Sequence, residues 1–370
     1  MKILITGICG FVGSSLARWF QAAGEGVSVC GIDNLIRPGS EINRPQLQSM
    51  GIEVWHADVR VASDLENLPR ADWVIDAAAN PSVLAGVDGR SSSRQLMEHN
   101  LQGTLNLLEY AKRHAAGFVL LSSSRVYSIA VLARLPIKIE EQAFRLDSGA
   151  VLPPGLSAEG IAETFSVAPP ISLYGSTRLA SEILALEYGC SFQFPVWVNR
   201  CGVLAGAGQF GTAEQGIVSY WMHAHAARKP LRYIGFGGAG YQVRDVFHPH
   251  DLAGLLWSQM NSSQTGGERL FNIGGGAGNA MSLAELTAIC DAYFGPHAPE
   301  PDGRERPFDL PWIVMDSQKA AGQFGWKPER PLSAILEEIA GHVRRHPEWL
   351  DVSEGKTIRP ALEHTHARCG

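Results

Sequence analysis

A glycine-rich segment near the start of the chain constrains the fold more than any other feature of the sequence. Three glycines recur at three-residue spacing directly after the strand-like run of residues 2–6, and a helical pattern begins within the same segment. Glycines there allow a tight turn, close approach of the backbone to a pyrophosphate, and helix amides that face the phosphates. The segment predicts a dinucleotide-binding site formed by Gly7, Gly10, Phe11, Val12 and Gly13.

Short apolar runs then alternate with helical stretches. Strands are expected at 27–32, 52–56, 73–78 and 117–121, and a long helix at 91–114. This alternation predicts βαβ units, and therefore an α/β fold with a Rossmann-type, doubly wound parallel sheet. Further on we expect helices at 176–188, 282–294 and 332–345, a strand at 194–199, and a capping box of Ser282 and Glu285.

The composition excludes several classes of protein. With 370 residues, of which 45% are apolar, the chain can form about two structural units, and its net charge of −6 argues against a general nucleic-acid binder. It contains no apolar run of membrane-spanning length and no recognisable signal peptide, so we expect a cytoplasmic protein without membrane partners. The cysteines are scattered without CxxC spacing, which predicts neither a disulfide framework nor a metal site.

Carboxylates at two predicted strand ends indicate which dinucleotide binds. Asp33 lies 20 residues after Gly13, where a carboxylate accepts the hydroxyls of the adenosine ribose and repels a 2′-phosphate. NAD is therefore expected rather than NADP, although Arg37 keeps NADP open. Asn34, next to Asp33, is assigned to the same site, and Asp58 with the amide of Val59 could contact the adenine edge.

A tyrosine and an arginine four residues apart are the predicted catalytic pair beside that cofactor. Tyr174 and Arg178 lie on one helix face, and a fixed cation favours the phenolate that a tyrosine needs to act as a base. The phenolate would take a hydroxyl proton while hydride leaves the same carbon for NAD. Either Ser123 or Ser124 would hold the reacting oxygen; counting back from Tyr127 favours Ser123, and counting forward along the strand favours Ser124.

The run from Tyr174 to Glu182 resembles the YxxxK segment of the extended short-chain dehydrogenases/reductases. Other stations match in order, namely 77–79, 100–109, 122–127, 244–248, 271–275 and 324–328, so the resemblance covers about residues 1–345. It implies that Ala77, Ala78, Ala79, Asn100, Ser122, Tyr174, Arg178, Arg200 and Cys201 line the cofactor. Two residues depart from the pattern: Arg178 replaces the usual Lys, and Asp76 replaces a His that often precedes the alanines.

Within that group the chain is most similar to the 2-epimerase family that acts on CDP-tyvelose and CDP-paratose. The similarity lies in 160–164, 170–174, 206–216 and 242–246. It implies a nucleotide-diphosphate sugar as substrate, and a homodimer. Cations for the diphosphate are expected in the second half, and Arg244 and Arg306 are the candidates. The other predicted substrate-binding residues are Gln209, Gln215 and Asp309.

We expect an NAD-binding domain at 1–200, to which 241–262 returns, a substrate-binding lobe at 201–240 and 263–348, and a tail at 349–370. The expected function is epimerisation of a nucleotide sugar by transient oxidation of one carbinol. A 4-epimerase or a 4,6-dehydratase is an alternative, although Ser123, Ser124 and Arg125 contain no carboxylate for a dehydratase. An NAD-binding protein without turnover is an alternative of another class.

Overall fold

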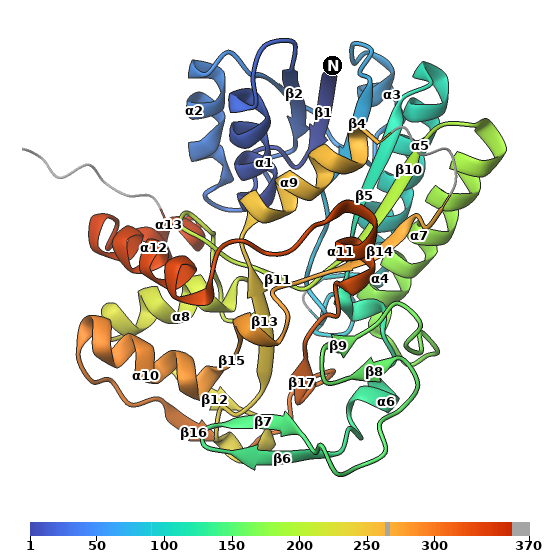
Figure 1. The fold of residues 1–370 in the computed structure, drawn as a ribbon. Helices are drawn as coiled ribbons and strands as arrows, with labels where there is room; N and C mark the ends of the chain where they lie inside the picture. The colour runs from blue at the N-terminus through green and yellow to red at the C-terminus, as the bar shows by residue number, and fades with distance from the viewer. Residues whose placement is uncertain (90, 263–266, 357–370) are drawn as a thin grey trace, which may run out of the picture.

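Seven parallel strands form the central sheet of the protein (Figure 1). The structure is a computed structural model that describes residues 1–89, 91–262 and 267–356. The strand order is β14-β10-β5-β4-β1-β2-β3. The strands are β1 (Lys2–Thr6), β2 (Ser28–Asp33), β3 (Glu53–His56), β4 (Trp73–Asp76), β5 (Gly117–Ser123), β10 (Val196–Cys201) and β14 (Leu270–Ile273). The predicted Rossmann-type α/β fold is confirmed.

Helices cover both faces of this sheet. Buried apolar residues of α1 (Phe11–Ala22), α2 (Asn43–Ser49) and α9 (Pro249–Met260) form one core with β1 and β14. The opposite core contains residues of α3 (Ala62–Glu66), α5 (Gly103–His114) and α7 (Ser172–Phe192). Most strand residues are buried, as a parallel sheet between two helical layers requires, and the edge strand β3 is the exception, with Glu53 and His56 exposed.

The helix predicted at 91–114 is divided by a change of winding. It consists of α4 (Ser93–Met97), a π-helical turn η2 (Glu98–Gln102) and α5. Such turns interrupt helices mainly at functional sites, and this one contains Asn100. The predicted capping box of Ser282 and Glu285 is confirmed at the start of α10 (Leu283–Phe294), and the predicted helix 332–345 is α12 (Leu332–Arg345).

The second half builds a smaller layer beside the sheet. A third core joins α8 (Ile217–Ala226), α10 and α12. The strands β11 (Val203–Leu204), β13 (Val243–Phe247), β15 (Ala280–Ser282) and β17 (Trp312–Ile313) form a small sheet, and β12 (Arg232–Ile234) pairs with β16 (Glu300–Asp302). The chain nevertheless returns to the large sheet within this half, because β14 pairs with β10 although it lies in the range assigned to the substrate-binding lobe.

Two other segments have more regular structure than their sequences suggested. The long connection between Tyr127 and Tyr174 contains α6 (Ile129–Leu132), the hairpin β6 (Ile137–Glu140) with β7 (Ala143–Leu146), and the short pair β8 (Leu156–Ser157) with β9 (Gly160–Ile161). The tail begins with α13 (Trp349–Ser353), and its part from 357 to 370 lies outside the described residues. No helix in the described part of the chain is both long and apolar enough to span a membrane.

Candidate active site

The glycine-rich turn leaves a cradle beside the ends of β1 and β4. Gly7 has a left-handed φ of 62°, and a Cβ there would lie 3.2 Å from Cα of Ala78. A Cβ on Gly13 would lie 2.2 Å from the carbonyl oxygen of Gly7, so only glycine lets α1 begin this close to the turn. Thr6 fixes the opposite wall, because its hydroxyl accepts hydrogen bonds from the amides of Ala77 (3.1 Å) and Ala78 (3.0 Å).

Asp33 is held rigidly at the end of β2. Its two carboxylate oxygens accept hydrogen bonds from the amides of Cys9 and Leu35, each at 2.8 Å, and burial raises the pKa of this carboxyl. A carboxylate next to the glycine turn suits the ribose role predicted for it. Arg37 points elsewhere: its guanidinium donates to Gln215 Oε1 (2.8 Å) and to the carbonyl of Phe210, and is thus engaged within the protein.

Asn34, assigned to the cofactor site beside Asp33, and Asp58, a predicted adenine contact, line a hollow at the ends of β2 and β3. Asn34 and Asp58 lie in a cavity of about 350 Å³, and Asn34 Nδ2 donates to Asp58 at 3.0 Å. Arg60 donates to both Asp58 oxygens, at 3.0 and 2.7 Å, and these contacts hold the pKa of Asp58 well below its usual range although burial opposes them. Val59 lies between Asp58 and Arg60 in the sequence, and its carbonyl accepts a hydrogen bond from Asn106 at 2.8 Å.

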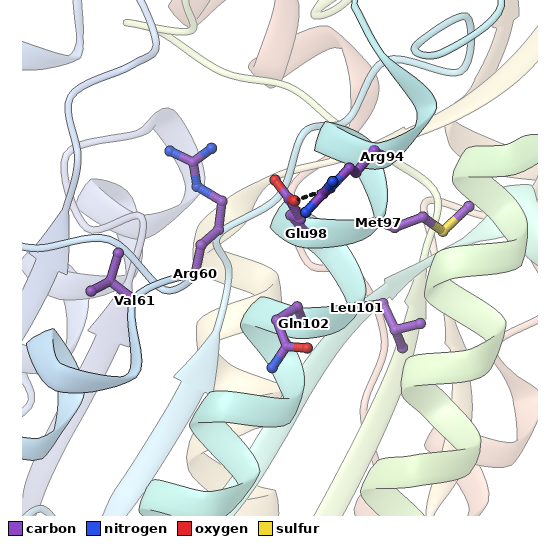
Figure 2. A pocket seen from close by; sticks show the side chains of 7 residues that line it. All are labelled: Arg60, Val61, Arg94, Met97, Glu98, Leu101 and Gln102. Atoms are coloured by element: carbon purple, nitrogen blue, oxygen red, sulfur yellow. Dashed lines mark hydrogen bonds and ion pairs between the residues drawn. The ribbon is translucent and has the colours of Figure 1, made fainter.

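Arg60 also borders a larger hollow of about 540 Å³ (Figure 2). Figure 2 shows that its walls come from the loop after β3 and from α4 with η2, where Arg94 and Glu98 form an ion pair at 2.8 Å. Its lining residues are Arg60, Val61, Arg94, Met97, Glu98, Leu101 and Gln102. None of the predicted catalytic residues lines it, so we place no chemistry there.

Asn100 joins three elements around α7, the helix that carries Tyr174. Its side chain accepts from the amide of Asn80 (2.8 Å) and donates to the carbonyl of the same residue (3.1 Å), in the segment that follows the exposed Ala79. It also donates to Thr177 on α7 at 3.2 Å. Asn100 is fully buried, so the π-helical turn fixes both the loop after β4 and the helix that carries Tyr174.

Tyr174 and Arg178 both point into the interior from α7. Only 7% of Tyr174 and 1% of Arg178 are exposed, so Arg178 is not a surface cation. The guanidinium of Arg178 donates through Nη2 to the carbonyl of Leu121 on β5, while its Nε and Nη1 are buried without a hydrogen-bond partner. Two buried donors without partners fit a ligand with hydroxyl acceptors, such as the ribose of NAD.

The three consecutive serines at the junction of β5 and the next turn have different surroundings. Ser122 is buried and donates to Glu182 on α7, which gives it a structural partner. Ser123 Oγ accepts from the amide of Arg125 at 3.2 Å and keeps its own hydrogen for another acceptor. Ser124 is 8% exposed and begins the short turn η3 (Ser124–Val126).

Arg200 and Cys201, at the end of β10, are largely enclosed. The Arg200 side chain donates to Glu182 and to the hydroxyl of Tyr127, so any contact with cofactor is left to its backbone. Burial raises the pKa of the Cys201 thiol to about 12, which is consistent with no covalent role for it.

The predicted substrate residues fall into two groups. Arg244 donates to Asp309 at 3.1 Å, and the carbonyl of Arg306 accepts from the amide of Asp309 at 3.1 Å. Gln209 and Gln215 lie together in the loop before α8, where Gln209 Nε2 donates to the carbonyl of Leu204 and Gln215 accepts from Arg37. Gln215 therefore contacts the cofactor-binding half through Arg37.

Sequence reasoning assigned no role to two residues that the structure places at this centre. Glu182 connects β5, β10 and α7, and its only sequence signal is its position eight residues after Tyr174, on the same helix face. Arg125 lies directly after the predicted catalytic serines, and its backbone carbonyl touches α7: a Cβ on Gly175 would lie 2.3 Å from that oxygen. Within the described ranges, no group of three or more His, Cys, Asp or Glu side chains could hold a metal ion.

Comparisons with known proteins agree with this architecture. The family profile described as NAD dependent epimerase/dehydratase family matches residues 3–274. The chain is 29% identical over 339 residues to CDP-paratose 2-epimerase of Salmonella typhi, which covers 89% of this chain and 95% of that protein. It is 26% identical to dTDP-L-rhamnose 4-epimerase of Burkholderia thailandensis, covering 91% and 93% of the two chains.

Solved structures give the same fold. A point mutant of the UDP-glucuronic acid 4-epimerase of Bacillus cereus, in complex with a fluorinated UDP-glucuronic acid and NAD, superposes with a TM-score of 0.74 at 22% identity, covering 93% of this chain and 99% of that one. The UDP-glucose 4-epimerase of Thermus thermophilus in complex with NAD gives 0.72 at 25% identity, with the same coverage. The chain is an enzyme that uses NAD, and it belongs to the NAD-dependent epimerase/dehydratase family of nucleotide-sugar enzymes.

Proposed function

We propose that this enzyme epimerises a CDP-linked sugar at C2, interconverting CDP-paratose and CDP-tyvelose. The observation that carries the epimerase reading is the end of β5, where Ser123, Ser124 and Arg125 offer hydroxyls and a cation, while the carboxylate that accepts from Ser122, that of Glu182, is engaged by Arg200. Loss of water requires an acid/base pair beside the oxidised sugar. The CDP-linked substrate is supported by the relative from Salmonella typhi, which is named a CDP-paratose 2-epimerase.

The chain's own residues divide the work of moving one proton. Tyr174, as phenolate, takes the proton from the reacting hydroxyl and later returns it, and Arg178 supplies the neighbouring positive charge. We assign the hydrogen bond to the reacting oxygen to Ser123, because its oxygen already accepts from an amide and its hydrogen is left to donate. When bound, NAD supplies the hydride chemistry, accepting hydride from the carbinol carbon and returning it.

The remaining residues bind and orient. Gly7, Gly13 and Asp33 form the cradle for pyrophosphate and ribose, and Asn100 holds the catalytic helix in register with the loop after β4. Between the two halves of the reaction the sugar ketone must present its other face. Proton and hydride both return to the sugar, so the overall reaction involves no net oxidation.

Turnover in deuterated water tests this function. CDP-paratose should give CDP-tyvelose with hydrogen, not deuterium, at C2, as read by NMR of the product. Tyr174→Phe should reduce turnover by about 10²–10⁴-fold. Tyr188→Phe on the same helix, which removes a hydroxyl that donates to Glu109 at 2.7 Å, should retain it.

Other outcomes would replace the proposal. Deuterium at C2 would indicate direct proton abstraction. Conversion of UDP-glucose or a dTDP-sugar, with CDP-sugars unchanged, would identify a 4-epimerase, and release of water would identify a dehydratase. Binding of NAD without turnover of any nucleotide sugar would support a non-catalytic role.

A further inference from the structure

We propose that Arg125 binds the sugar-proximal phosphate of the substrate and thereby places the reacting carbon against Tyr174. The inference rests on the proposed function only in requiring a nucleotide-diphosphate substrate; it does not depend on the base. It follows from three observations, namely the anchoring of Arg125 beside Tyr174, the excess of positive charge around it, and the strained segment that it contacts.

Arg125 is fixed against the catalytic helix through its backbone. A Cβ on Gly175 would lie 2.3 Å from the Arg125 carbonyl oxygen and 3.2 Å from its carbonyl carbon, so the residue after Tyr174 must be glycine for this packing. The amide of Arg125 meanwhile donates to Ser123. Arg125 therefore lies between the proposed oxygen-binding serine and the turn of α7 that carries the catalytic tyrosine.

The side chain of Arg125 extends from there to the segment that contains Asp309. Its Nη1 donates to the carbonyl of Phe308 at 3.0 Å, while Arg244 contacts the next residue, Asp309, at 3.1 Å. Phe308 has a left-handed φ of 60°, which is unfavourable for a bulky residue and typical of sites where function maintains strain. The two arginines thus hold one strained segment from neighbouring sides.

The charges in this group do not balance. Three arginines, Arg125, Arg244 and Arg306, act on one another, and Asp309 is the carboxylate that opposes both Arg125 and Arg244. Asp245 also faces Arg244, but burial raises the pKa of its carboxyl to about 7, so it is only partly ionised near neutral pH. Positive charge is therefore in excess, and a substrate diphosphate brings negative charges whose oxygens match the forked donors of arginine.

The position of Arg125 among these cations indicates how the substrate is oriented. Arg125 is the member of the group that packs on the first turn of α7, next to Tyr174. The phosphate that it binds is therefore the one closest to the reacting sugar, the β-phosphate. Since C2 is adjacent to the carbon that bears the diphosphate, a phosphate held this close to Tyr174 favours reaction at C2 over the more distant C4.

The test compares diphosphate and monophosphate binding to the NAD-loaded enzyme. Dissociation constants are measured by calorimetry for CDP and CMP, UDP and UMP, and dTDP and dTMP. The wild type should prefer at least one diphosphate to its monophosphate, and Arg125→Gln should reduce that preference by about 10–100-fold, the usual contribution of hydrogen bonds to charged groups. Glutamine still offers a donor to Phe308, and Arg125→Lys, which keeps the charge, should retain most of the preference.

Arg304→Gln is the matched control, because Arg304 lies near the same segment but is paired with Asp302 on the surface. This substitution should change neither the diphosphate nor the monophosphate dissociation constant. Retained NAD and an unchanged melting temperature show that each variant is folded. A wild type without diphosphate preference, or an Arg125→Gln enzyme that keeps it or loses monophosphate affinity equally, would overturn the proposal. If only the CDP assignment is wrong, the Arg125-dependent preference appears with another base.

Discussion

Glu182 and Arg200 form an ion pair inside the protein, with Nη2 of the arginine 2.7 Å from Oε2 of the glutamate. Ser122 donates to the same carboxylate, and the hydroxyl of Tyr127 accepts from Arg200. The pair therefore connects β5, β10 and α7, and fixes the helix that carries Tyr174 relative to the strand that carries Ser123. Both side chains are almost completely buried, so each charge depends on the other.

Glu182→Ala should be strongly destabilising, because it leaves the Arg200 guanidinium buried without its counter-charge. Removal of one partner of a buried ion pair costs about 3–5 kcal/mol, which urea unfolding of the purified variant would measure. Glu300→Ala is the control, since it breaks an exposed pair with Arg232 and should cost about 0–1 kcal/mol. Equal losses for the two variants would contradict the structural role given to Glu182.

The sequence predicted the features that depend on local pattern. The glycine turn, the strand alternation and the i to i+4 pair of Tyr174 and Arg178 each place a residue by spacing along one element, and the structure has those elements. The contacts of Glu182 and Arg125 join residues far apart in the chain. Glu182 on α7 contacts Arg200 on β10, and Arg125 contacts Phe308, so no local sequence pattern predicts either contact.

The long connection after Tyr127 shows a second reason why the sequence did not predict all of the fold. Its Pro and Gly residues suggested a loop, yet they delimit two short hairpins, whose pairing across a few residues has no periodicity long enough to detect. The return of β14 to the large sheet is similar. A four-residue strand reveals nothing about its neighbour, and β10 becomes that neighbour only through the tertiary fold.

Asp33→Ser should reduce the discrimination between NAD and NADP. The carboxylate is held by the amides of Cys9 and Leu35, and its charge would repel a 2′-phosphate, whereas serine is neutral. Dissociation constants of both dinucleotides for the cofactor-free protein would measure the change. Asp72→Ser removes a carboxylate that accepts from the Lys2 amide elsewhere on the sheet, and should leave the ratio unchanged. A wild type that binds both dinucleotides equally would refute the role of Asp33.

The histidine pair between α8 and α12 should make the protein sensitive to acid. His342 Nδ1 lies 3.3 Å from His223 Nε2, and burial lowers the pKa of His223 to about 4 and that of His342 to about 3. Both are neutral in the folded state, whereas unfolded histidines bind protons below about pH 6.5. Their contribution to stability is therefore complete above about pH 6.5 and is lost as the pH falls towards about 4.

Comparison with a variant isolates the contribution of these histidines to the pH dependence of stability. Between about pH 7 and about pH 5 each histidine should account for roughly 1–2 kcal/mol of lost unfolding free energy. Burial raises the pKa of Asp245 to about 7, which acts in the opposite direction over the same range, so the wild-type profile alone is ambiguous. As the pH falls from about 7 to about 5, the wild type should lose more unfolding free energy than His342→Phe, because the variant lacks one of the two histidines. A stability difference that stays constant with pH would contradict the assignment.

Arg178 provides the most direct test of the catalytic helix. Its guanidinium is buried, donates to the Leu121 carbonyl and has two donors without partners, which leaves these donors available to a ligand. Arg178→Ala should reduce turnover on the order of 10²-fold, comparable to loss of an acid/base group. Arg178→Lys keeps the charge and loses only the fork, so it should retain substantial activity. Arg94→Ala, at an exposed ion pair on α4, is the control for removal of a positive charge as such. The measurement is kcat with one verified substrate, together with NAD content after denaturation. If Arg178→Ala turned over like the wild type, Tyr174 alone would carry the proton chemistry, and the buried guanidinium would serve only to hold α7 against β5.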